Sequence, residues 1–253
     1  MSVKGSNFSG IYADSYDLMY SHLDALNEFN QAEDFCREFV EKPHTVLDIG
    51  GGTGRFTQLF IDKYPQVILV EPSKCMAKIA ASKFEDEKKL TILRKSAQNF
   101  SLPQKADGAY MMFSVASYFS TPRTFKAALR NIAANLNPNS YIYFDVWNYD
   151  ASKKRKFTQT VKTFNHKNQV IERTVTLNQS KVQEMDIGFY TLELTIFFQN
   201  LATKQIHIEN HKLAEVSEMW IHSLLSQTPE IADFKTRKNP NKDGNLEVCI
   251  ALH

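Results

Sequence analysis

The chain has 253 residues, 43% of them hydrophobic, which suits one large domain or one domain carrying an insertion. Its 30 basic and 28 acidic residues leave a formal charge of +2, which excludes a protein drawn to nucleic acid or to a membrane surface by long-range charge. The 3 cysteines are isolated, so we expect reduced thiols and no metal site, and no apolar stretch suits a signal sequence or a membrane-spanning helix. We therefore expect a cytoplasmic protein.

The first segment with a pattern covers residues 7–20 and is rich in tyrosine. Tyr12, Tyr16 and Tyr20 recur at every fourth position, which predicts a helix with one aromatic face. Such a face either packs in a core or lines a pocket. An amphipathic helix follows and leads to the first strand; its apolar face consists of Phe29, Ala32, Phe35, Cys36, Phe39 and Val40.

A β-branched and aliphatic run over residues 46–49 predicts a buried strand, and a cluster of glycines follows it before a helical pattern begins. Glycine permits positive φ and lets a ligand lie against the main chain beside the N–H groups of a helix start. The spacing does not fit the dinucleotide pattern G-x-G-x-x-G, because Arg55 and Thr57 occupy the place of the third glycine. It fits D-x-G-x-G-x-G, and this glycine turn comprises Asp48, Gly50, Gly51, Gly52 and Gly54.

A second buried strand, residues 67–70, ends at Glu71. An acidic side chain at that place can accept hydrogen bonds from both hydroxyls of a ribose. Taken alone, Glu71 could equally be an acid in the first turn of the helix that Pro72 and Ser73 begin. Its pairing with the glycine turn favours the ribose role.

Further strands are predicted at residues 90–93, 106–114 and 141–147, and helices at 73–84 and 122–135, with a turn at 136–140. Strands that alternate with helices predict right-handed parallel crossovers and therefore an α/β, doubly wound sheet. Ligands bind such sheets outside the carboxyl ends of the strands.

The pattern changes after Trp147. Residues 153–156 are a basic run, and residues 169–177, 189–200 and 204–211 are β-rich, with period-two alternation. A helix at 217–226 and short strands near 231–234 and 246–252 return to the core pattern. We expect a mostly parallel, seven-stranded sheet with an antiparallel β insertion. The predicted divisions are an N-terminal part (1–42), a cofactor-binding core (43–150), the insertion (151–212) and the return to the core sheet (213–253).

The glycine turn together with Glu71 resembles the first motif of the class I S-adenosylmethionine-dependent methyltransferases, which have a Rossmann-like fold. Several shorter strings resemble the N,N-dimethyltransferases of nucleotide-linked amino sugars: residues 112–119, Trp147, Glu172-Arg173 and residues 208–211. The resemblance spans nearly the whole chain. It implies S-adenosylmethionine as cofactor, S-adenosylhomocysteine as product, and a small amine, such as one on a nucleotide sugar, as acceptor.

The resemblance also implies roles for individual residues. The tyrosine-rich segment would close over the cofactor as a lid. Besides the glycine turn, the residues implied to bind the cofactor are Tyr12, Tyr20, Glu71, Pro72, Ser96, Ala97, Gln98, Phe113 and Ser114. The catalytic candidates are Tyr16, Tyr118 and His211, and the residues implied to bind the acceptor are Trp147, Arg173, Tyr118 and His211.

Three positions depart from the family's pattern. Ser96 and Gln98 stand where the family usually has acids that read the adenine edge, and a neutral acceptor is weaker than a charged one. Tyr118 stands where one type of member carries a histidine, and a phenol of pKa about 10 is a poor base at neutral pH. Methyl transfer to an amine mainly requires alignment, a dry site and a neutral nucleophile, so activity is still expected.

Structural explanations stay open beside these roles. The structural alternative for His211 is a hydrogen bond at a strand end. Arg173 is equally compatible with a solvated strand residue and with a phosphate contact, and the run at 153–156 is compatible with a solvated loop. The insertion could cover the active site or build a homodimer.

The alternatives to an amine N-methyltransferase are a small-molecule O-methyltransferase and a non-catalytic S-adenosylmethionine-binding partner subunit. A methyltransferase of nucleic acid or protein is disfavoured by the balanced charge. It is also disfavoured by residues 113–116, which read FSVA where base amino methyltransferases usually have N/D-P-P-Y/F.

Overall fold

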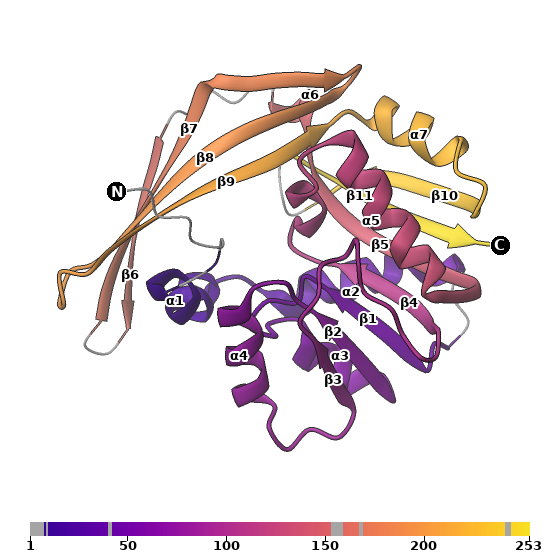
Figure 1. The fold of residues 1–253 in the computed structure, drawn as a ribbon, viewed down its shortest axis with the longest axis horizontal. Helices are drawn as coiled ribbons and strands as arrows, with labels where there is room; N and C mark the ends of the chain where they lie inside the picture. The colour runs from indigo at the N-terminus through magenta and orange to yellow at the C-terminus, as the bar shows by residue number, and fades with distance from the viewer. Residues whose placement is uncertain (1–7, 9, 40–41, 153–158, 167–168, 241–243) are drawn as a thin grey trace.

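The computed structural model describes residues 8, 10–39, 42–152, 159–166, 169–240 and 244–253. Within these residues a single sheet of eleven strands runs in the order β3-β2-β1-β4-β5-β9-β8-β7-β6, and β11 joins it by pairing with β5 and β10 (Figure 1). The core strands are β1 (Thr45–Ile49), β2 (Gln66–Val70), β3 (Leu90–Leu93), β4 (Ala106–Met111), β5 (Leu136–Asn148), β10 (Ile231–Lys238) and β11 (Asn245–Leu252).

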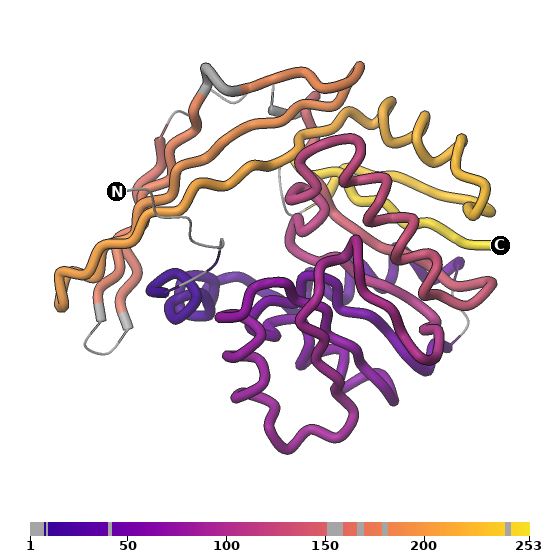
Figure 2. The backbone as a smooth tube through the Cα atoms, viewed as in Figure 1, coloured from indigo at the N-terminus to yellow at the C-terminus, as the bar shows by residue number. Residues whose placement is uncertain are grey.

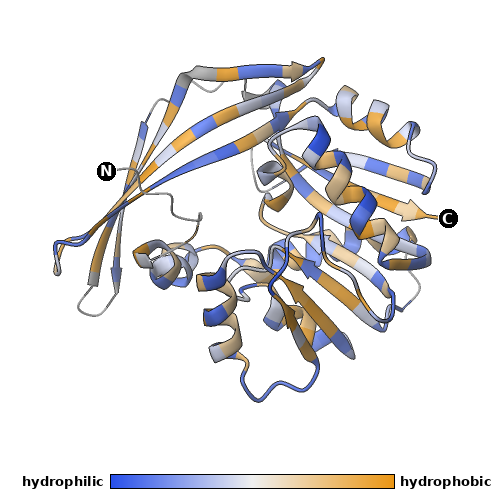
Figure 3. Cartoon of the chain, in the orientation of Figure 1, coloured by the Kyte–Doolittle hydropathy of each residue, from blue (hydrophilic) through white to orange (hydrophobic). Residues whose placement is uncertain are grey.

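The five strands β1 to β5 are parallel, and β11 lies antiparallel to both β5 and β10. Helices cover both faces because the strands are apolar on both sides. Val46 packs with α2 (Ala25–Cys36) and α3 (Thr57–Lys63) on one face, whereas Leu47 packs with α5 (Pro122–Ala134) and α7 (Glu218–Ser226) on the other. Figure 3 shows the apolar residues concentrated in these central strands. The predicted α/β, doubly wound fold is confirmed.

The insertion is an antiparallel ribbon of long strands that arches away from the core (Figure 2). It consists of β6 (Gln159–His166), β7 (Gln169–Asp186), β8 (Phe189–Asn200) and β9 (Ile206–Val216). Burial alternates along β8, so one face is apolar and the other polar. The apolar face packs against α1 (Gly10–Tyr20), which supplies Tyr12 and Met19 to the same cluster as Leu192 and Phe198. Helix α1 is therefore held under the insertion.

The prediction of seven strands was too low. The core has the predicted strands, but β9 pairs in parallel with the end of β5, with Trp147 opposite Glu215 and Asn148 opposite Val216. Hydrogen bonding continues from core to insertion, so both belong to one sheet. The bounds also differ, since β9 continues to Val216 and β5 begins at Leu136, where a turn was expected; Leu136 pairs with Ala106 before a register shift. The basic run at 153–156 lies outside the described residues.

Candidate active site

The glycine turn connects β1 to α3 at the carboxyl end of the sheet. The N–H of Gly50 donates to the carbonyl of Val70 at 2.7 Å, so the turn leaves β1 while still bonded to β2. At Gly54 (φ +85°) a Cβ would lie 2.3 Å from the ring of Phe84, so the fold itself requires glycine there. At Gly52 (φ +61°) the nearest atom to such a Cβ is the Gly50 oxygen at 3.9 Å. Gly52 therefore borders open space.

Glu71 follows β2 and faces the glycine turn. One carboxylate oxygen accepts from the N–H of Gly52 at 3.1 Å and the other from the N–H of Ser73 at 2.6 Å. Burial raises the pKa of Glu71 to about 7, against the lowering effect of these two hydrogen bonds. Pro72 is exposed beside it, and Ser73 caps α4 (Lys74–Lys83). Glu71 thus lies where a ribose bound at the turn would need an acceptor.

Asp48 lies beneath the turn. Its carboxylate is buried and accepts from the hydroxyl of Thr57 at 2.6 Å, and burial raises its pKa to about 7. A Cβ on Gly51 would lie 2.6 Å from this carboxylate. The structure therefore shows Asp48 bracing the turn against α3, and its predicted contact with the cofactor stays a prediction.

The loop after β3 lies beside Glu71, because the N–H of Glu71 donates to the carbonyl of Leu93 at 3.0 Å. The Ser96 hydroxyl donates to the side chain of Asn99 at 3.0 Å, and its oxygen retains capacity to accept. Ala97 is buried, and its carbonyl accepts from Asn131 at 3.0 Å; Gln98 is half-buried. The predicted contacts of Ser96, Ala97 and Gln98 with adenine stay predictions.

The tyrosines of α1 share one face, as their spacing predicts. The ring of Tyr16 lies 6.0 Å from that of Tyr12 and 4.7 Å from that of Tyr20. Tyr12 is 3% exposed and stacks on Phe198 of β8 at 4.2 Å, so it packs into the insertion. Burial raises the pKa of Tyr16 well above its ordinary value, and the nearby Arg55 opposes that shift.

Polar contacts fix α1 to the core. Asp17 accepts from the hydroxyl of Thr53, next to Gly54, at 2.5 Å and from Lys83 of α4 at 2.6 Å. Phe8 bridges the two halves of the molecule, because its carbonyl accepts from Ser73 at 2.9 Å and its N–H donates to Glu209 of the insertion at 2.7 Å. Phe8 and α1 together contact the glycine turn, α4 and β9.

The chain after β4 has an unusual backbone. Phe113 and Ser114 have φ values of +64° and +62°, a left-handed conformation that side chains other than glycine rarely adopt. Asp145 of β5 holds the turn by accepting from the N–H of Ser114 at 2.7 Å and its hydroxyl at 3.0 Å, and Asn245 donates to both residues at 2.8 Å. Backbone strain of this kind concentrates at functional sites.

Tyr118 and His211, predicted separately, are in contact. The Tyr118 hydroxyl lies 3.0 Å from Nδ1 of His211, and Nε2 of His211 lies 2.9 Å from the carboxylate of Glu209. His211 is 0% exposed, and the Phe8 ring packs edge-on against it at 5.1 Å. Burial raises the pKa of Tyr118 well above its ordinary value.

The rings of Phe113 and Tyr20 form a row across the site, here called the aromatic ladder, and an arginine lies at each end of it. The guanidinium of Arg55 lies 5.0 Å from the ring of Phe113, which contacts Tyr20 at 5.0 Å, and Tyr20 lies 5.4 Å from the guanidinium of Arg173. Arg173 also donates to the Tyr20 hydroxyl at 2.7 Å. Nη1 of Arg55 and Nε of Arg173 are buried and have no hydrogen-bond partner among the described residues. A buried donor without a partner is costly, so both positions suit an anionic ligand.

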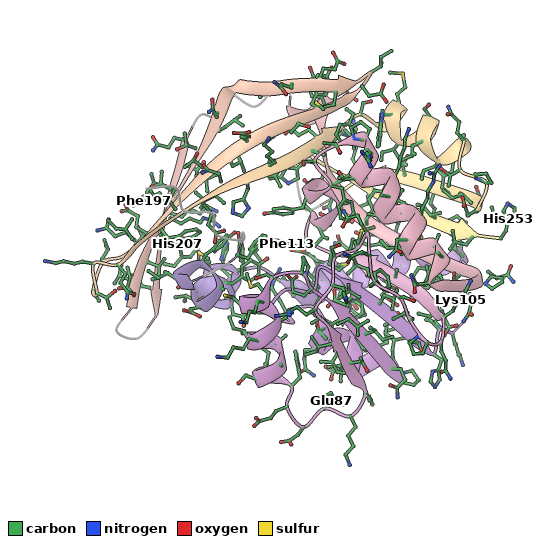
Figure 4. The ribbon with its side chains drawn as sticks, in the orientation of Figure 1. Glu87, Lys105, Phe113, Phe197, His207 and His253 are labelled. Carbon is green, nitrogen blue, oxygen red and sulfur yellow. The ribbon has the colours of Figure 1, made fainter. Side chains whose placement is uncertain are left out.

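Trp147 lies where core and insertion meet. It is half-buried, its backbone N–H donates to the hydroxyl of Ser117 at 3.0 Å, and its side chain packs against the apolar cluster of α1 and the insertion. Figure 4 labels Phe113 where α1 faces the core and His207 where the insertion approaches α1. Phe113, Arg173 and His211, which come from the core and the insertion, therefore lie against the tyrosines of α1.

Sequence reasoning missed three residues of this arrangement. Glu209 lies between His207 and His211 on the same face of β9, and its period-two spacing from both histidines was the available signal. Arg55 was noted only because it breaks the dinucleotide pattern. Asp17 follows Tyr16 in the tyrosine-rich segment, but its contact with Thr53 had no local signal, since folding alone brings the two residues together.

Other features of the chain lie away from this site. A cavity of about 540 Å³ borders Asp107, Asn137 and Pro43 at the amino-terminal ends of the core strands. No described helix has the length and apolarity needed to cross a membrane. Among the described residues no group of three or more His, Cys, Asp or Glu is placed to hold a metal ion.

The fold and the site define a nucleotide-cofactor-binding α/β protein, with a glycine turn after β1 and an acid after β2. More particularly, the chain belongs to the Methyltransferase domain family, whose model matches residues 25–187, more than half of the chain. It is 25% identical over 144 residues to a dTDP-4-amino-2,3,4,6-tetradeoxy-D-glucose N,N-dimethyltransferase from Saccharopolyspora spinosa. That match covers 56% of this chain and 57% of the relative's length.

Solved structures share the whole fold. DesVI from Streptomyces venezuelae is 17% identical, with a TM-score of 0.75 over 95% of this chain and 98% of that one. The sugar N-methyltransferase KedS8 from a Streptoalloteichus species is 15% identical, with a TM-score of 0.74 over 98% and 96%. CalS10, an amino pentose methyltransferase from Micromonospora echinaspora solved with S-adenosylmethionine, is 14% identical, with a TM-score of 0.71 over 97% and 98%. The likeness includes the insertion, since these matches span nearly the full chain.

Proposed function

We propose that this protein is an S-adenosylmethionine-dependent methyltransferase that methylates the amine of a small molecule, namely an amino sugar linked to a nucleotide. The observation that carries the proposal is the position of the Glu71 carboxylate, which is bonded to Gly52 and borders the open space at that glycine. The sugar N-methyltransferases among the matched proteins support the acceptor class.

The residues at the turn fit a nucleoside with an amino-acid tail. Glu71 would accept from the ribose hydroxyls, and the loop at Ser96 would face the base. The tail carries a carboxylate, and Arg55 offers it a buried N–H that has no partner in the described residues. Each polar part of the cofactor thereby meets a group of suitable charge.

The aromatic rings around the turn suit the cationic part of the cofactor. The ring of Tyr20 contacts those of Tyr16 and Phe113, and Phe113 lies beside Arg55. Electron-rich ring faces attract a cation, and the effect is larger where water is excluded. When bound, S-adenosylmethionine would supply an electrophilic methyl group on its sulfonium. The lid would keep the surroundings of this group dry.

The acceptor would lie where the lid, the carboxyl end of β4 and the insertion meet. Trp147 and the Tyr118–His211 pair border this region from the core and from β9. The partnerless Nε of Arg173 suits a phosphate oxygen, as expected for a nucleotide-linked substrate. Amine is favoured over hydroxyl as the nucleophile because burial keeps Tyr118 neutral, and a hydroxyl needs a stronger base than a neutral phenol provides.

A calorimetric titration with S-adenosylmethionine and S-adenosylhomocysteine, with NAD as the control ligand, tests the cofactor. Turnover is then measured in the same sample on a panel of nucleotide amino sugars, simple amines and matching alcohols. We expect binding of both adenosyl ligands, no binding of NAD, and S-adenosylhomocysteine release with amines. Binding without turnover on any acceptor would support the non-catalytic subunit, and turnover with alcohols alone would support an O-methyltransferase.

A further inference from the structure

β9 carries a row of titratable side chains. His207, Glu209 and His211 occupy every second position and so lie on the same face of the strand. Glu209 connects the two rings, because its carboxylate oxygens lie 2.9 Å from Nε2 of His207 and 2.9 Å from Nε2 of His211. Tyr118 extends the row through its hydroxyl, 3.0 Å from Nδ1 of His211. Four groups are therefore connected in series by hydrogen bonds.

The series runs from the interior of the proposed site to the surface. The side chain of His211 is 0% exposed and that of Glu209 is 4% exposed, whereas that of His207 is 20% exposed. The rings of Phe8 and Tyr12 cover His211 at 5.1 and 5.8 Å, and Phe8 also covers Tyr118 at 5.3 Å. Solvent thus meets this row at His207.

Amine methylation needs an exit for a proton. A nitrogen–carbon bond forms at the acceptor while the carbon–sulfur bond of the sulfonium donor breaks and its electron pair stays on sulfur. The nitrogen becomes cationic, and the neutral product forms only after one N–H proton leaves. A lid that excludes water also excludes the ordinary proton acceptor.

Tyr118 cannot accept this proton alone. Tyr16, Tyr20, Glu71 and Glu209 all face it, and with burial they raise the pKa of its hydroxyl, so a phenolate is disfavoured. The hydroxyl can receive a proton from nitrogen only while it passes its own proton onward. Nδ1 of His211 is the described atom positioned to take it.

We propose that Tyr118, His211, Glu209 and His207 form a proton relay that carries the amine proton from the methylation site to solvent; the proposal rests on the proposed function. The amine proton moves to Tyr118 as the phenol proton moves to Nδ1 of His211. The Nε2 proton of His211 then passes to one oxygen of Glu209, Glu209 passes a proton from its other oxygen to Nε2 of His207, and His207 releases its Nδ1 proton to water. One proton enters and one leaves, with no redox change. His211, Glu209 and His207 act through Tyr118 and are positioning residues.

Kinetics of His207→Gln test the relay, because this outer residue is the one whose replacement disturbs the buried site least. With the best acceptor of the panel we expect kcat to fall by about tenfold or more, within the range for assisted proton transfer, while KM changes little. The solvent deuterium isotope effect on kcat should increase, and added imidazole should restore part of the rate. His222→Gln replaces an exposed histidine of α7 that contacts Thr236, Glu218 and Phe234, and should leave all these values unchanged.

Unchanged kcat and an unchanged isotope effect in His207→Gln would overturn the relay while leaving the methyltransferase assignment intact. Tyr118→Phe provides a second variant. We expect a loss of kcat that imidazole does not restore, because the phenyl ring still occupies the space that imidazole would need to reach the amine. Equal restoration of kcat by imidazole in His207→Gln and in Tyr118→Phe would also contradict the relay.

Histidine ¹⁵N NMR of the ligand-free protein tests the relay independently of turnover. The relay requires His211 as the neutral Nε2–H tautomer, with Nδ1 accepting from Tyr118, and it requires His207→Gln to shift the His211 resonances. A His211 ring that is cationic at every pH could not take the phenol proton, and that result would overturn the relay. Absence of turnover in the wild-type protein with a neutral His211 would instead overturn the proposed function.

Discussion

The N–H of Gly52 donates a hydrogen bond to the carboxylate of Glu71 across 3.1 Å. The two residues follow β1 and β2, which are adjacent parallel strands, so both lie at the carboxyl edge of the sheet. The contact orders the glycine turn and at the same time places a carboxylate beside the open space at Gly52. Cofactor affinity should therefore respond to changes at either residue.

Replacing Glu71 by alanine should weaken the binding of S-adenosylmethionine. Loss of a hydrogen bond to a charged acceptor costs about 1.5–3 kcal/mol, or roughly 10- to 150-fold in Kd. Isothermal calorimetry measures the change, and Glu85→Ala, at an exposed position after α4, is the matched control. Wild-type affinity in Glu71→Ala would refute the ribose assignment.

Cofactor affinity should also depend on pH through Glu71. Its pKa in the folded protein is about 7 against 4.5 for a free glutamate, so the folded state keeps the proton between about pH 4.5 and 7, where the unfolded chain has lost it. Ionisation of Glu71 therefore lowers stability as pH rises through this window. The ionised form is the better acceptor for ribose hydroxyls, so affinity should rise from pH 6 to pH 8.

Glu71→Gln should abolish this rise in affinity, because the amide does not titrate. Asp48 has a similar pKa, about 7, and Asp48→Asn identifies its share of the pH dependence. Calorimetric affinities for S-adenosylmethionine at several pH values show which of the two carboxyl groups causes the rise. A rise that persists in Glu71→Gln and vanishes in Asp48→Asn would assign the dependence to the brace beneath the turn.

Gly52→Ala and Gly54→Ala should differ, although both residues have positive φ. The left-handed backbone costs roughly 1–2 kcal/mol in each variant. The new Cβ at position 54 would also collide with Phe84 at 2.3 Å, whereas the one at position 52 enters open space. We expect Gly54→Ala to lower the melting temperature more, and Gly52→Ala to lose cofactor affinity while staying folded. Thermal unfolding and calorimetry of the pair check this; equal affinities in wild type and Gly52→Ala would show that the space is not used.

Asp145→Asn should destabilise the left-handed turn at Ser114. Asp145 is buried and accepts hydrogen bonds from Ser114 and Asn245. The NH₂ group of an asparagine at this place would face one of these donors, which would then have no acceptor. One buried unsatisfied group costs about 1–3 kcal/mol of unfolding free energy. Urea denaturation measures the loss, with the exposed Asp233→Asn as control. A loss no larger than that of the control would show that the network does not hold the turn.

Much of the core was predictable because its signals are local. The hydrophobic runs of β1 to β5 follow from the burial of a parallel sheet on both faces, and the cap of α5 is visible as Thr121 followed by Pro122. The glycine turn and Glu71 were recognisable for the same reason, since strand, turn and acid follow one another directly along the chain.

The sequence alone thus determined the doubly wound core, its cofactor edge and the aromatic face of α1, because period and turn chemistry are properties of neighbouring residues. Tertiary structure alone decided that β9 continues the core sheet beside β5 and that Tyr118 contacts His211. It alone placed Arg55 and Arg173 at the ends of one aromatic ladder. These contacts join residues far apart in the chain, and their register is set by the packing of the insertion on the lid, which no local pattern records.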